Sequence, residues 1–342
     1  MYLFSNYNSK FGQKLKNMHT LKEFQQIIKD AIVKEEIKKN PQALYDPINY
    51  TLASGGKRIR PALVLLAFNL FSDDIQKAIK PAIGLEIFHN FTLLHDDIMD
   101  HAEIRRGAPA VHKKWNENTA ILSGDAMLIN AYAYFLDIDS PQVREILKVF
   151  NEMALEVCEG QQYDMEFEDR DEVTEKEYLR MIELKTSVLL AGALKIGALL
   201  GSAHAADADL LYEYGRNLGL AFQLQDDLLD VYGDEKVFGK QIGGDIVSNK
   251  KTFLLIKTRE IAGDEDLKTL EYWLQNNNNA NRDEKIKAIT EIYNNLNIKE
   301  ITKEKILSLT QKALNLLDEV KVENHKKIEL KNLAGKLINR NS

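Results

Sequence analysis

Apolar residues recur three and four positions apart along almost the whole chain, and this spacing most restricts the possible folds. The pattern is clear from the start, where Leu21, Phe24 and Ile28 follow one another at helical intervals. Alternation with a period of two, which would indicate strands, is almost absent. All six prolines lie at or before Pro141, so the rest of the chain contains no strong helix breaker. We therefore predict an all-α protein.

Three long apolar segments, near 141–167, 174–201 and 207–231, are typical of helices in the middle of a bundle. Glycine-containing stretches interrupt the helices at 54–56, 105–107 and 243–245. Residues 1–18 are polar and without a pattern, so we expect a flexible N-terminal extension. The remainder, 19–342, is predicted to form one domain.

The composition excludes several classes of protein. With 44% hydrophobic residues and one cysteine in 342 residues, the chain is neither a low-complexity sequence nor a disulfide-stapled scaffold. A net charge of −7 argues against a nucleic-acid partner, and no run of apolar residues is long enough to span a membrane. The N-terminus has no signal-peptide pattern, so we expect a cytoplasmic protein.

Two acidic stretches resemble each other, Asp96-Asp97-Ile-Met-Asp100 and Asp226-Asp227-Leu-Leu-Asp230. On a helix, residues four apart share a face, so the first and third aspartates of each stretch point the same way. Such a pair can share a hard cation like Mg²⁺, which commonly bridges a carboxylate and a substrate phosphate. Acidic groups at a helix C-terminus are unfavourable to the helix dipole, which indicates that a cation binds there. The acidic stretches alone leave a calcium site or a structural patch open.

Two basic stretches indicate an anionic ligand. The stretch 55–61, Gly-Gly-Lys-Arg-Ile-Arg-Pro, opens a predicted helix, with glycines that let the backbone approach a ligand and with Pro61 expected at the first helical position. Arg105-Arg106-Gly107 follows the first acidic stretch, and guanidinium groups can fork onto phosphate oxygens. Together these stretches predict diphosphate binding.

In order, spacing and flanking residues, the sequence resembles the trans-isoprenyl diphosphate synthases, the polyprenyl synthetase family that includes farnesyl and geranylgeranyl diphosphate synthases. The resemblance runs from about Leu52 to Leu255. It rests on 55–61, His89, 94–100, 105–107, Gly124-Asp125, Gly160-Gln161, Lys185-Thr186, 222–230 and Gly239-Lys240. It implies the isoprenoid synthase fold, a single bundle of ten or more helices around a central cavity, and a homodimer.

The resemblance also implies the reaction, in which isopentenyl diphosphate condenses head to tail with an allylic diphosphate (dimethylallyl, geranyl or farnesyl). Asp96 and Asp100 are then expected to hold two Mg²⁺ ions and Asp226 a third, around the leaving diphosphate. The other catalytic residues that the resemblance implies are Asp97, Lys185, Thr186, Gln223, Asp227 and Asp230. The substrate-binding residues that it implies are Lys57, Arg60, His89, Arg105, Arg106, Lys240 and Lys250.

Product length is expected to depend on the residues four and five positions before Asp96. In the family these form the floor of the tunnel for the growing chain, and here they are Thr92 and Phe91. Phe91 is bulky and lies about one helical turn of 5.4 Å before the aspartates. We therefore expect a C20 product, with C15 as the alternative. The segment 232–240 is expected to close over the substrate.

Two other functions remain open at this stage. A class I terpene cyclase also combines an aspartate-rich motif with Mg²⁺, but it handles one diphosphate and would not need Lys57, Arg60 and His89. A non-catalytic regulatory subunit would keep the bundle, but such subunits generally lose one aspartate cluster. Both clusters are intact here.

Overall fold

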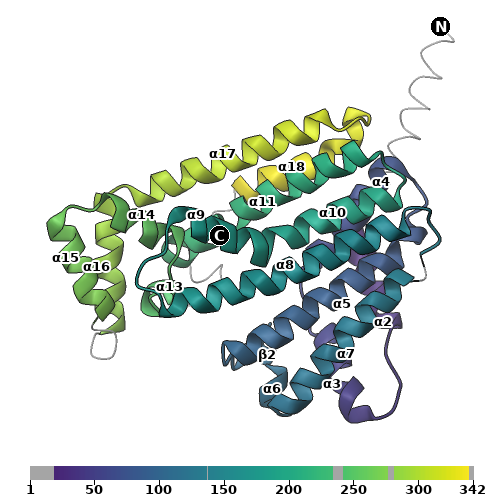
Figure 1. Ribbon diagram of the computed structural model, residues 1–342, viewed down its shortest axis with the longest axis horizontal. Coiled ribbons are helices and arrows are strands. Elements are labelled where there is room, and N and C mark those ends of the chain that lie inside the picture. The colour runs from purple at the N-terminus through teal and green to yellow at the C-terminus, as the bar shows by residue number, and fades with distance from the viewer. Residues whose placement is uncertain (1–18, 137, 234–241, 276–280, 339–342) are drawn as a thin grey trace, which may run out of the picture. The chain divides into compact units, whose positions relative to one another are not determined.

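The computed structural model describes residues 19–136, 138–233, 242–275 and 281–338 (Figure 1). The predicted N-terminal extension, Lys240 and most of the segment expected to close over the substrate lie outside these ranges. Within the described residues, regular structure is helical apart from one short hairpin, which confirms the all-α prediction. None of the described helices is long and apolar enough to cross a membrane.

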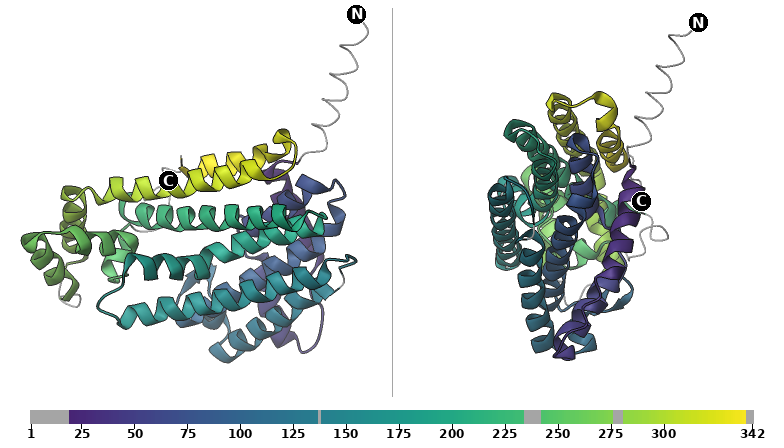
Figure 2. Two further views of the ribbon diagram at one scale, coloured as in Figure 1. Left: turned by 45° about the horizontal axis from the view of Figure 1, so that its top comes forward. Right: turned by 90° about the vertical axis from the view of Figure 1, so that its right-hand side faces the viewer.

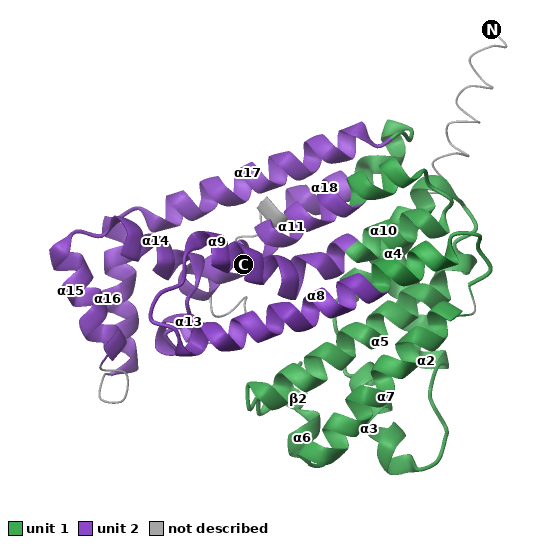
Figure 3. Cartoon of the chain, viewed as in Figure 1, with its two compact units in different colours: residues 1–150, 192–211, 321–329 green, residues 151–191, 212–320, 330–342 purple. Residues whose placement is uncertain are grey.

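The chain divides into two compact units (Figure 3). Unit 1 contains residues 1–150, 192–211 and 321–329, and unit 2 contains 151–191, 212–320 and 330–342. Three long helices contribute residues to both units, namely α8 (Val143–Asp169), α10 (Val188–Leu200) and α11 (Ala205–Tyr232). Helices α8 and α11 match the predicted segments 141–167 and 207–231, whereas the predicted segment 174–201 divides into α9 (Glu175–Ile182), the π-helix η1 (Glu183–Ser187) and α10.

Unit 1 is built around α4 and α5, and its other complete elements surround them. These elements are α2 (Leu21–Lys34), α3 (Gln42–Ala53), α4 (Ile59–Phe71), α5 (Gln76–Met99), β1 (Ile104–Arg105), β2 (Ala108–Pro109), α6 (Val111–Lys114), α7 (Glu117–Leu136) and the 3₁₀ helix η2 (Asn324–Lys327). Every residue of α4 from Pro61 to Leu70 is buried, because this helix is apolar on all sides. Residues of α10 approach α4 closely, since a Cβ on Gly197 would lie 2.2 Å from the carbonyl oxygen of Val64.

Helix α5 packs along α7, and glycines make this contact close. A Cβ on Gly84 would lie 2.8 Å from Cβ of Tyr134, and one on Gly124 would lie 2.2 Å from Nε2 of His95. Side chains of each helix thus pack directly over glycines of the other. The first acidic motif therefore lies at the end of a closely packed helix.

The start of α4 differs from the prediction. The helix begins at Ile59, so Pro61 is its third residue and not its first. The difference costs little, because the first four N–H groups of a helix have no partner within it. The residue before the helix, Arg58, has a left-handed backbone with φ of 48°.

Unit 2 contains the remaining elements. They are α9 (Glu175–Ile182), the π-helix η1 (Glu183–Ser187), α13 (Gly244–Val247), α14 (Phe253–Ile261), α15 (Asp264–Gln275), α16 (Arg282–Asn295), α17 (Ile298–Glu319) and α18 (Ile328–Ile338), whose first two residues belong to unit 1. Helices α15 and α16, green in Figures 1 and 2, pack against each other. A capping box at Thr174 and Glu177 starts α9, which runs directly into η1 and then α10.

Candidate active site

The first acidic motif forms the C-terminal end of α5, as predicted. Asp97 is 3% exposed and accepts hydrogen bonds from Nε of Arg105 at 2.7 Å and from its Nη2. Nη2 of Arg105 also lies 3.8 Å from Oδ2 of Asp96. Burial opposes the charge of Arg105, but the hydrogen bond and charge of Asp97 prevail and raise its pKa. Asp97 is therefore used within the protein, whereas Asp96 is half-buried and Asp100 is exposed.

The hairpin β1–β2 places Arg106 and Gly107 in its turn. Both residues have positive φ, 54° and 78°, as a type I′ turn requires. Nη1 of Arg106 donates to the carbonyl oxygen of Gly55 at 2.8 Å and to Oδ1 of Asn90 at 3.1 Å. Gly56 has φ of 123°, and a Cβ there would lie 2.9 Å from Cζ of Arg106. The glycine pair predicted to admit a ligand thus also admits an arginine side chain.

His89 lies on α5 beside a cluster of arginines. Its Nε2 is 3.2 Å from Nη1 of Arg60. Burial and then the charges of Arg60 and Arg106 hold the pKa of His89 well below its usual value, so the ring is neutral. Because arginine can only donate, Nε2 accepts this bond and the ring proton is assigned to Nδ1. Nδ1 is buried and has no hydrogen-bond partner within the described part of the chain.

The other predicted residues of unit 1 differ in their surroundings. Lys57 is exposed, and its carbonyl oxygen accepts from the side-chain amide of Gln25. Phe91 is buried against the rings of Phe88 and His95, with centroids 5.7 and 4.8 Å away. Thr92 is half-buried, and its hydroxyl donates to the carbonyl oxygen of His89 at 2.8 Å.

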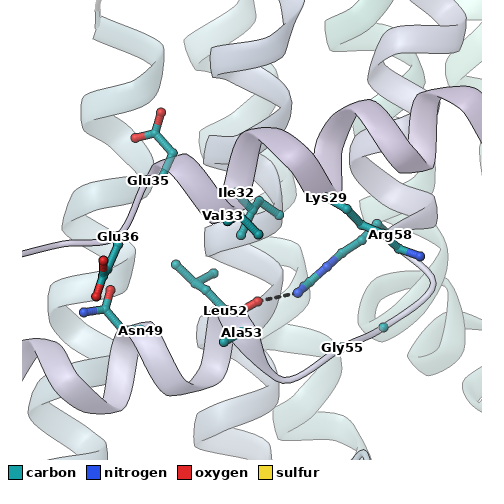
Figure 4. A pocket seen from close by; sticks show the side chains of 11 residues that line it. Lys29, Ile32, Val33, Glu35, Glu36, Asn49, Leu52, Ala53, Gly55 and Arg58 are labelled. Carbon is teal, nitrogen blue, oxygen red and sulfur yellow. Dashed lines mark hydrogen bonds between the residues drawn. The ribbon is translucent and has the colours of Figure 1, made fainter.

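A cavity of about 600 Å³ lies between α2, α3 and the loop that follows α3 (Figure 4). Backbone of Gly55 and Gly56 and the side chain of Arg58 form part of its wall. Nη2 of Arg58 donates to the carbonyl oxygen of Leu52 at 2.5 Å, the dashed line in Figure 4. The loop that carries Lys57 is thus held from one side by a side chain of its own.

The second acidic motif, on α11 in unit 2, has different hydrogen-bond partners from the first. Oδ2 of Asp227 accepts from the hydroxyl of Tyr178, and Oδ1 accepts from Nε2 of Gln223 at 3.1 Å. Oε1 of Gln223 in turn accepts from the hydroxyl of Thr186 at 3.3 Å. The predicted residues Thr186, Gln223 and Asp227 therefore form one chain of hydrogen bonds.

Asp227 carries a strongly perturbed carboxyl group. Burial, followed by the charge of Asp245, raises its pKa to about 7, against the hydrogen bonds that favour the charged form. Asp230 is also engaged, because its Oδ2 accepts the backbone N–H of Asp245 at 2.9 Å. Asp226 is half-buried and lies one turn before Asp230 on the same helix.

Lys185 and Thr186 lie in the π-helix η1. Nζ of Lys185 is 2.5 Å from Oδ2 of Asp164 on α8. The backbone of η1 is closely covered, since a Cβ on Gly160 would lie 2.2 Å from the amide nitrogen of Lys185 and one on Gly219 would lie 2.6 Å from Cα of Ser187. Irregular helical turns of this kind are frequent at functional sites. Lys250 is exposed.

The carboxylates of the two acidic motifs suit Mg²⁺ that is bound together with substrate, and not a metal ion held by the protein alone. Among the described residues, no three or more His, Cys, Asp or Glu side chains come together to hold a metal ion. Mg²⁺ is commonly bound by one or two carboxylates together with water and substrate phosphate oxygens. Asp96 with Asp100 on α5, and Asp226 on α11, suit that mode of binding, because they leave most of the coordination sphere to a diphosphate.

Sequence reasoning missed four residues that organise these sites, and it named Arg58 only as part of the basic stretch 55–61. The four are Glu86, Asn90, Tyr178 and Asp245. The sequence could have predicted that Glu86 has a partner, because it lies within the apolar run 82–88 and a glutamate is buried only when it is paired. The partner itself could not be read from the run.

Comparison with known proteins defines the class. The family model for polyprenyl synthetase matches residues 41–293, so the chain belongs to the polyprenyl synthetase family, as the motifs predicted. Among similar proteins, the geranylgeranyl diphosphate synthase of Methanosarcina mazei is 46% identical over 222 residues, which cover 64% of this chain and 68% of that protein. The short chain isoprenyl diphosphate synthase of Methanothermobacter thermautotrophicus is 41% identical, over 74% of this chain and 78% of that protein.

Solved structures are similar over almost the whole chain. A crystal structure of a geranylgeranyl pyrophosphate synthase is 44% identical, with a TM-score of 0.90, and the match covers 95% of this chain and all of that one. The fold predicted from the resemblance, the all-α isoprenoid synthase fold, is therefore confirmed.

Proposed function

We propose that this protein, a prenyltransferase, condenses isopentenyl diphosphate head to tail with an allylic diphosphate to give a short-chain prenyl diphosphate in the cytoplasm. The names of its relatives support this reaction over a cyclase or a regulatory subunit. The observation that carries the proposal is that α5 presents two kinds of anion-binding chemistry. His89 lies among arginines, and Asp96 and Asp100 offer carboxylates to a metal two turns further along.

The arginine side suits a diphosphate bound without metal. Lys57, Arg60 and Arg106 supply positive charge, and Nδ1–H of neutral His89 supplies a buried donor that has no partner in the described chain. An unpaired buried donor costs about 1–3 kcal/mol, which an acceptor oxygen of a ligand would remove. We assign the diphosphate of isopentenyl diphosphate to these residues.

The carboxylate side suits the allylic diphosphate. Asp96 and Asp100, with Asp226, would hold about three Mg²⁺ ions, whose chemistry is to stabilise the negative charge that develops on the leaving diphosphate. Arg105, Lys185, Lys240 and Lys250 would add positive charge. We also propose that residues 19–342 act as one domain.

Other polar side chains of unit 2 would position the aspartate motif or stabilise the reacting carbocation. Asp227 and Asp230, like Asp97 in unit 1, keep the motif in place through bonds within the protein. Thr186 and Gln223, which are hydrogen-bonded to each other, would stabilise a developing carbocation through their oxygen dipoles. We propose that the released diphosphate, whose negative charge has risen, accepts the final proton.

One experiment tests the reaction and the product together. The purified protein is incubated with Mg²⁺, isopentenyl diphosphate and, separately, dimethylallyl, geranyl or farnesyl diphosphate, and products are sized after dephosphorylation. We expect elongation that depends on isopentenyl diphosphate and stops at C20, with C15 as the alternative. Turnover of an allylic diphosphate alone would indicate a cyclase, and no turnover by the purified chain would revive the regulatory subunit.

A homodimer is the assembly we propose. Leu122, Ile129 and Leu136 on α7 are 60%, 70% and 69% exposed and recur every seven residues, with Ala126 and Ala133 between them. This heptad spacing suits packing against the same helix of a second copy. Ile129→Asp should convert the dimer to monomer in light scattering after size exclusion, while Leu307→Asp, an exposed leucine on α17, serves as the control. A dimer that survives Ile129→Asp would exclude this interface.

A further inference from the structure

Glu86 is a buried carboxylate in the middle of α5. It is 1% exposed, and its Oε1 accepts from Nη1 of Arg58 at 2.5 Å and from Nδ2 of Asn90 at 2.9 Å. Arg58 is itself buried, with its other Nη donating to the end of α3 (Figure 4). Burying two charges is costly, and an apolar pair of similar size is often as stable. The pair therefore calls for an explanation other than stability.

The bonds of Glu86 and Asn90 reach both basic loops. Arg58 belongs to the loop 54–58, which carries Lys57 and leads into Arg60. Asn90 links Glu86 to the second basic loop, because its Oδ1 accepts a hydrogen bond from Nη1 of Arg106 at 3.1 Å. The same Nη1 donates to the carbonyl oxygens of Ser54 and Gly55 at 3.2 and 2.8 Å, which closes a ring of contacts.

One face of α5 thus holds three arginines. Glu86, Asn90 and Asp97 are four and seven residues apart, so they lie along one face, and they bind Arg58, Arg106 and Arg105 respectively. The neighbouring face carries His89, Asp96 and Asp100, the groups assigned to substrate and metal. The arginine-holding face is distinct from the face that we assign to binding.

We propose that Glu86 and Asn90 are positioning residues, which hold the loop 54–58 and Arg106 so that Lys57, Arg60 and Arg106 converge on the diphosphate of the second substrate. The inference rests on the proposed function, since it concerns the site assigned there to isopentenyl diphosphate. Neither residue touches that substrate. They act through the arginine side chains and the loop backbone.

Electrostatics supports a role for the charge of Glu86. The charge of Arg58 lowers the pKa of Arg106, after burial, and the charge of Glu86 raises it. Arg58, Arg60, Arg105 and Arg106 together lower the pKa of His89. Without Glu86, these cations repel one another and Arg58 keeps an uncompensated charge. The loop would then move away from the geometry that binds a diphosphate.

Glu86→Gln tests the proposal. We expect KM for isopentenyl diphosphate to rise about tenfold, with kcat and KM for the allylic diphosphate changed by less than about twofold. Asn90→Ala should act in the same direction and by less. Glu329→Gln is the matched control, because this half-buried carboxylate of unit 1 accepts the N–H of Leu21 at 2.9 Å and lies outside the arginine contacts. It should lower the melting temperature without changing either KM.

A double variant separates positioning from stability. Arg58→Met with Glu86→Met replaces the buried pair by apolar side chains and should recover the melting temperature lost in Glu86→Gln. If the positioning role is correct, KM for isopentenyl diphosphate stays raised in the double variant. If KM returns to the wild-type value together with stability, the pair is only structural and the proposal is wrong.

Calorimetric binding of inorganic diphosphate without Mg²⁺ distinguishes this proposal from the proposed function. A wild-type protein that binds diphosphate but condenses nothing overturns the reaction, while affinity about tenfold weaker in Glu86→Gln still supports the positioning role. Equal affinity in wild type and folded Glu86→Gln overturns the positioning role even if condensation proceeds. A wild-type protein that condenses its substrates but binds no diphosphate without Mg²⁺ overturns the positioning role and leaves the reaction standing.

Discussion

The two acidic motifs have the same spacing but are supported by different partners. In each, the middle aspartate is turned inward, with Asp97 3% and Asp227 4% exposed. Asp97 binds the permanent cation Arg105, whereas Asp227 binds the neutral hydroxyl of Tyr178 and the amide of Gln223. Burial, followed by the charge of Asp245, raises the pKa of Asp227 to about 7, although the hydrogen bonds from Tyr178 and Gln223 favour the charged form.

The comparison shows that Asp-Asp-x-x-Asp assigns its positions by helical phase. The first and third residues share a face, while the second points elsewhere. In both copies the protein uses the second position for internal bonding. The two copies then differ in the partners of that position, a guanidinium for Asp97 and neutral donors for Asp227, so the same substitution should act differently in each.

The largest effect is expected from the first position of either motif. Asp96→Ala and Asp226→Ala should each lower turnover by about a thousandfold, because each removes a carboxylate assigned to metal. Circular dichroism should show an intact helical fold in both variants. Full activity in either one would exclude that motif from metal binding and break the parallel between them.

The middle positions should separate the motifs by stability. Asp97→Asn leaves Arg105 without its carboxylate and should lower the free energy of unfolding by about 2 kcal/mol. Asp227→Asn keeps partners for Tyr178 and Gln223 and should cost less than about 1 kcal/mol. Urea unfolding of the metal-free variants measures both. Equal losses would show that the difference in partners has no energetic consequence.

The position five residues before each first aspartate gives a third contrast, since Phe91 precedes Asp96 and Ala221 precedes Asp226. Phe91→Ala makes the first motif like the second and should lengthen the products beyond C20 by opening the predicted tunnel. Phe91→Leu, which keeps most of the volume, is the matched control. An unchanged product distribution by chromatography would show that Phe91 does not form the floor of the predicted tunnel.

The last contrast is a pH dependence that we expect of the second motif. Asp227 has a pKa of about 7 in the folded protein and 3.8 as its ordinary value, so folding favours its protonated form. Relative to Asp227→Asn, the metal-free wild type should lose stability as pH rises from about 4 to about 7 and then level off. Melting temperatures with a chelator measure this difference. A difference that is constant over that range would contradict the raised pKa.

Much of the site could be predicted from the sequence because its signals are local. Helical spacing and the absence of proline after Pro141 predicted the all-α class and the long helices. The i, i+4 spacing of Asp96 and Asp100 follows from the geometry of a single helix. The order of the motifs predicted the family, which the family model confirmed.

Irregular elements were not predicted. The π-helix at Glu183–Ser187 reads as ordinary helix in the sequence, because its extra residue is set by packing against Gly160 and Gly219. The hairpin around Arg106 and Gly107 has strands of only two residues, too short for any periodic pattern.

The sequence by itself determined which residues are helical, which aspartates share a face and which stretches are basic, since these properties depend on neighbours within a few positions. Only the tertiary structure decided that Glu86 holds Arg58, Asn90 holds Arg106 and Tyr178 meets Asp227. These partners are 28, 16 and 49 residues apart in the chain. Their choice depends on how helices pack, because a buried charge or polar group must find its partner wherever the fold brings one within hydrogen-bonding distance.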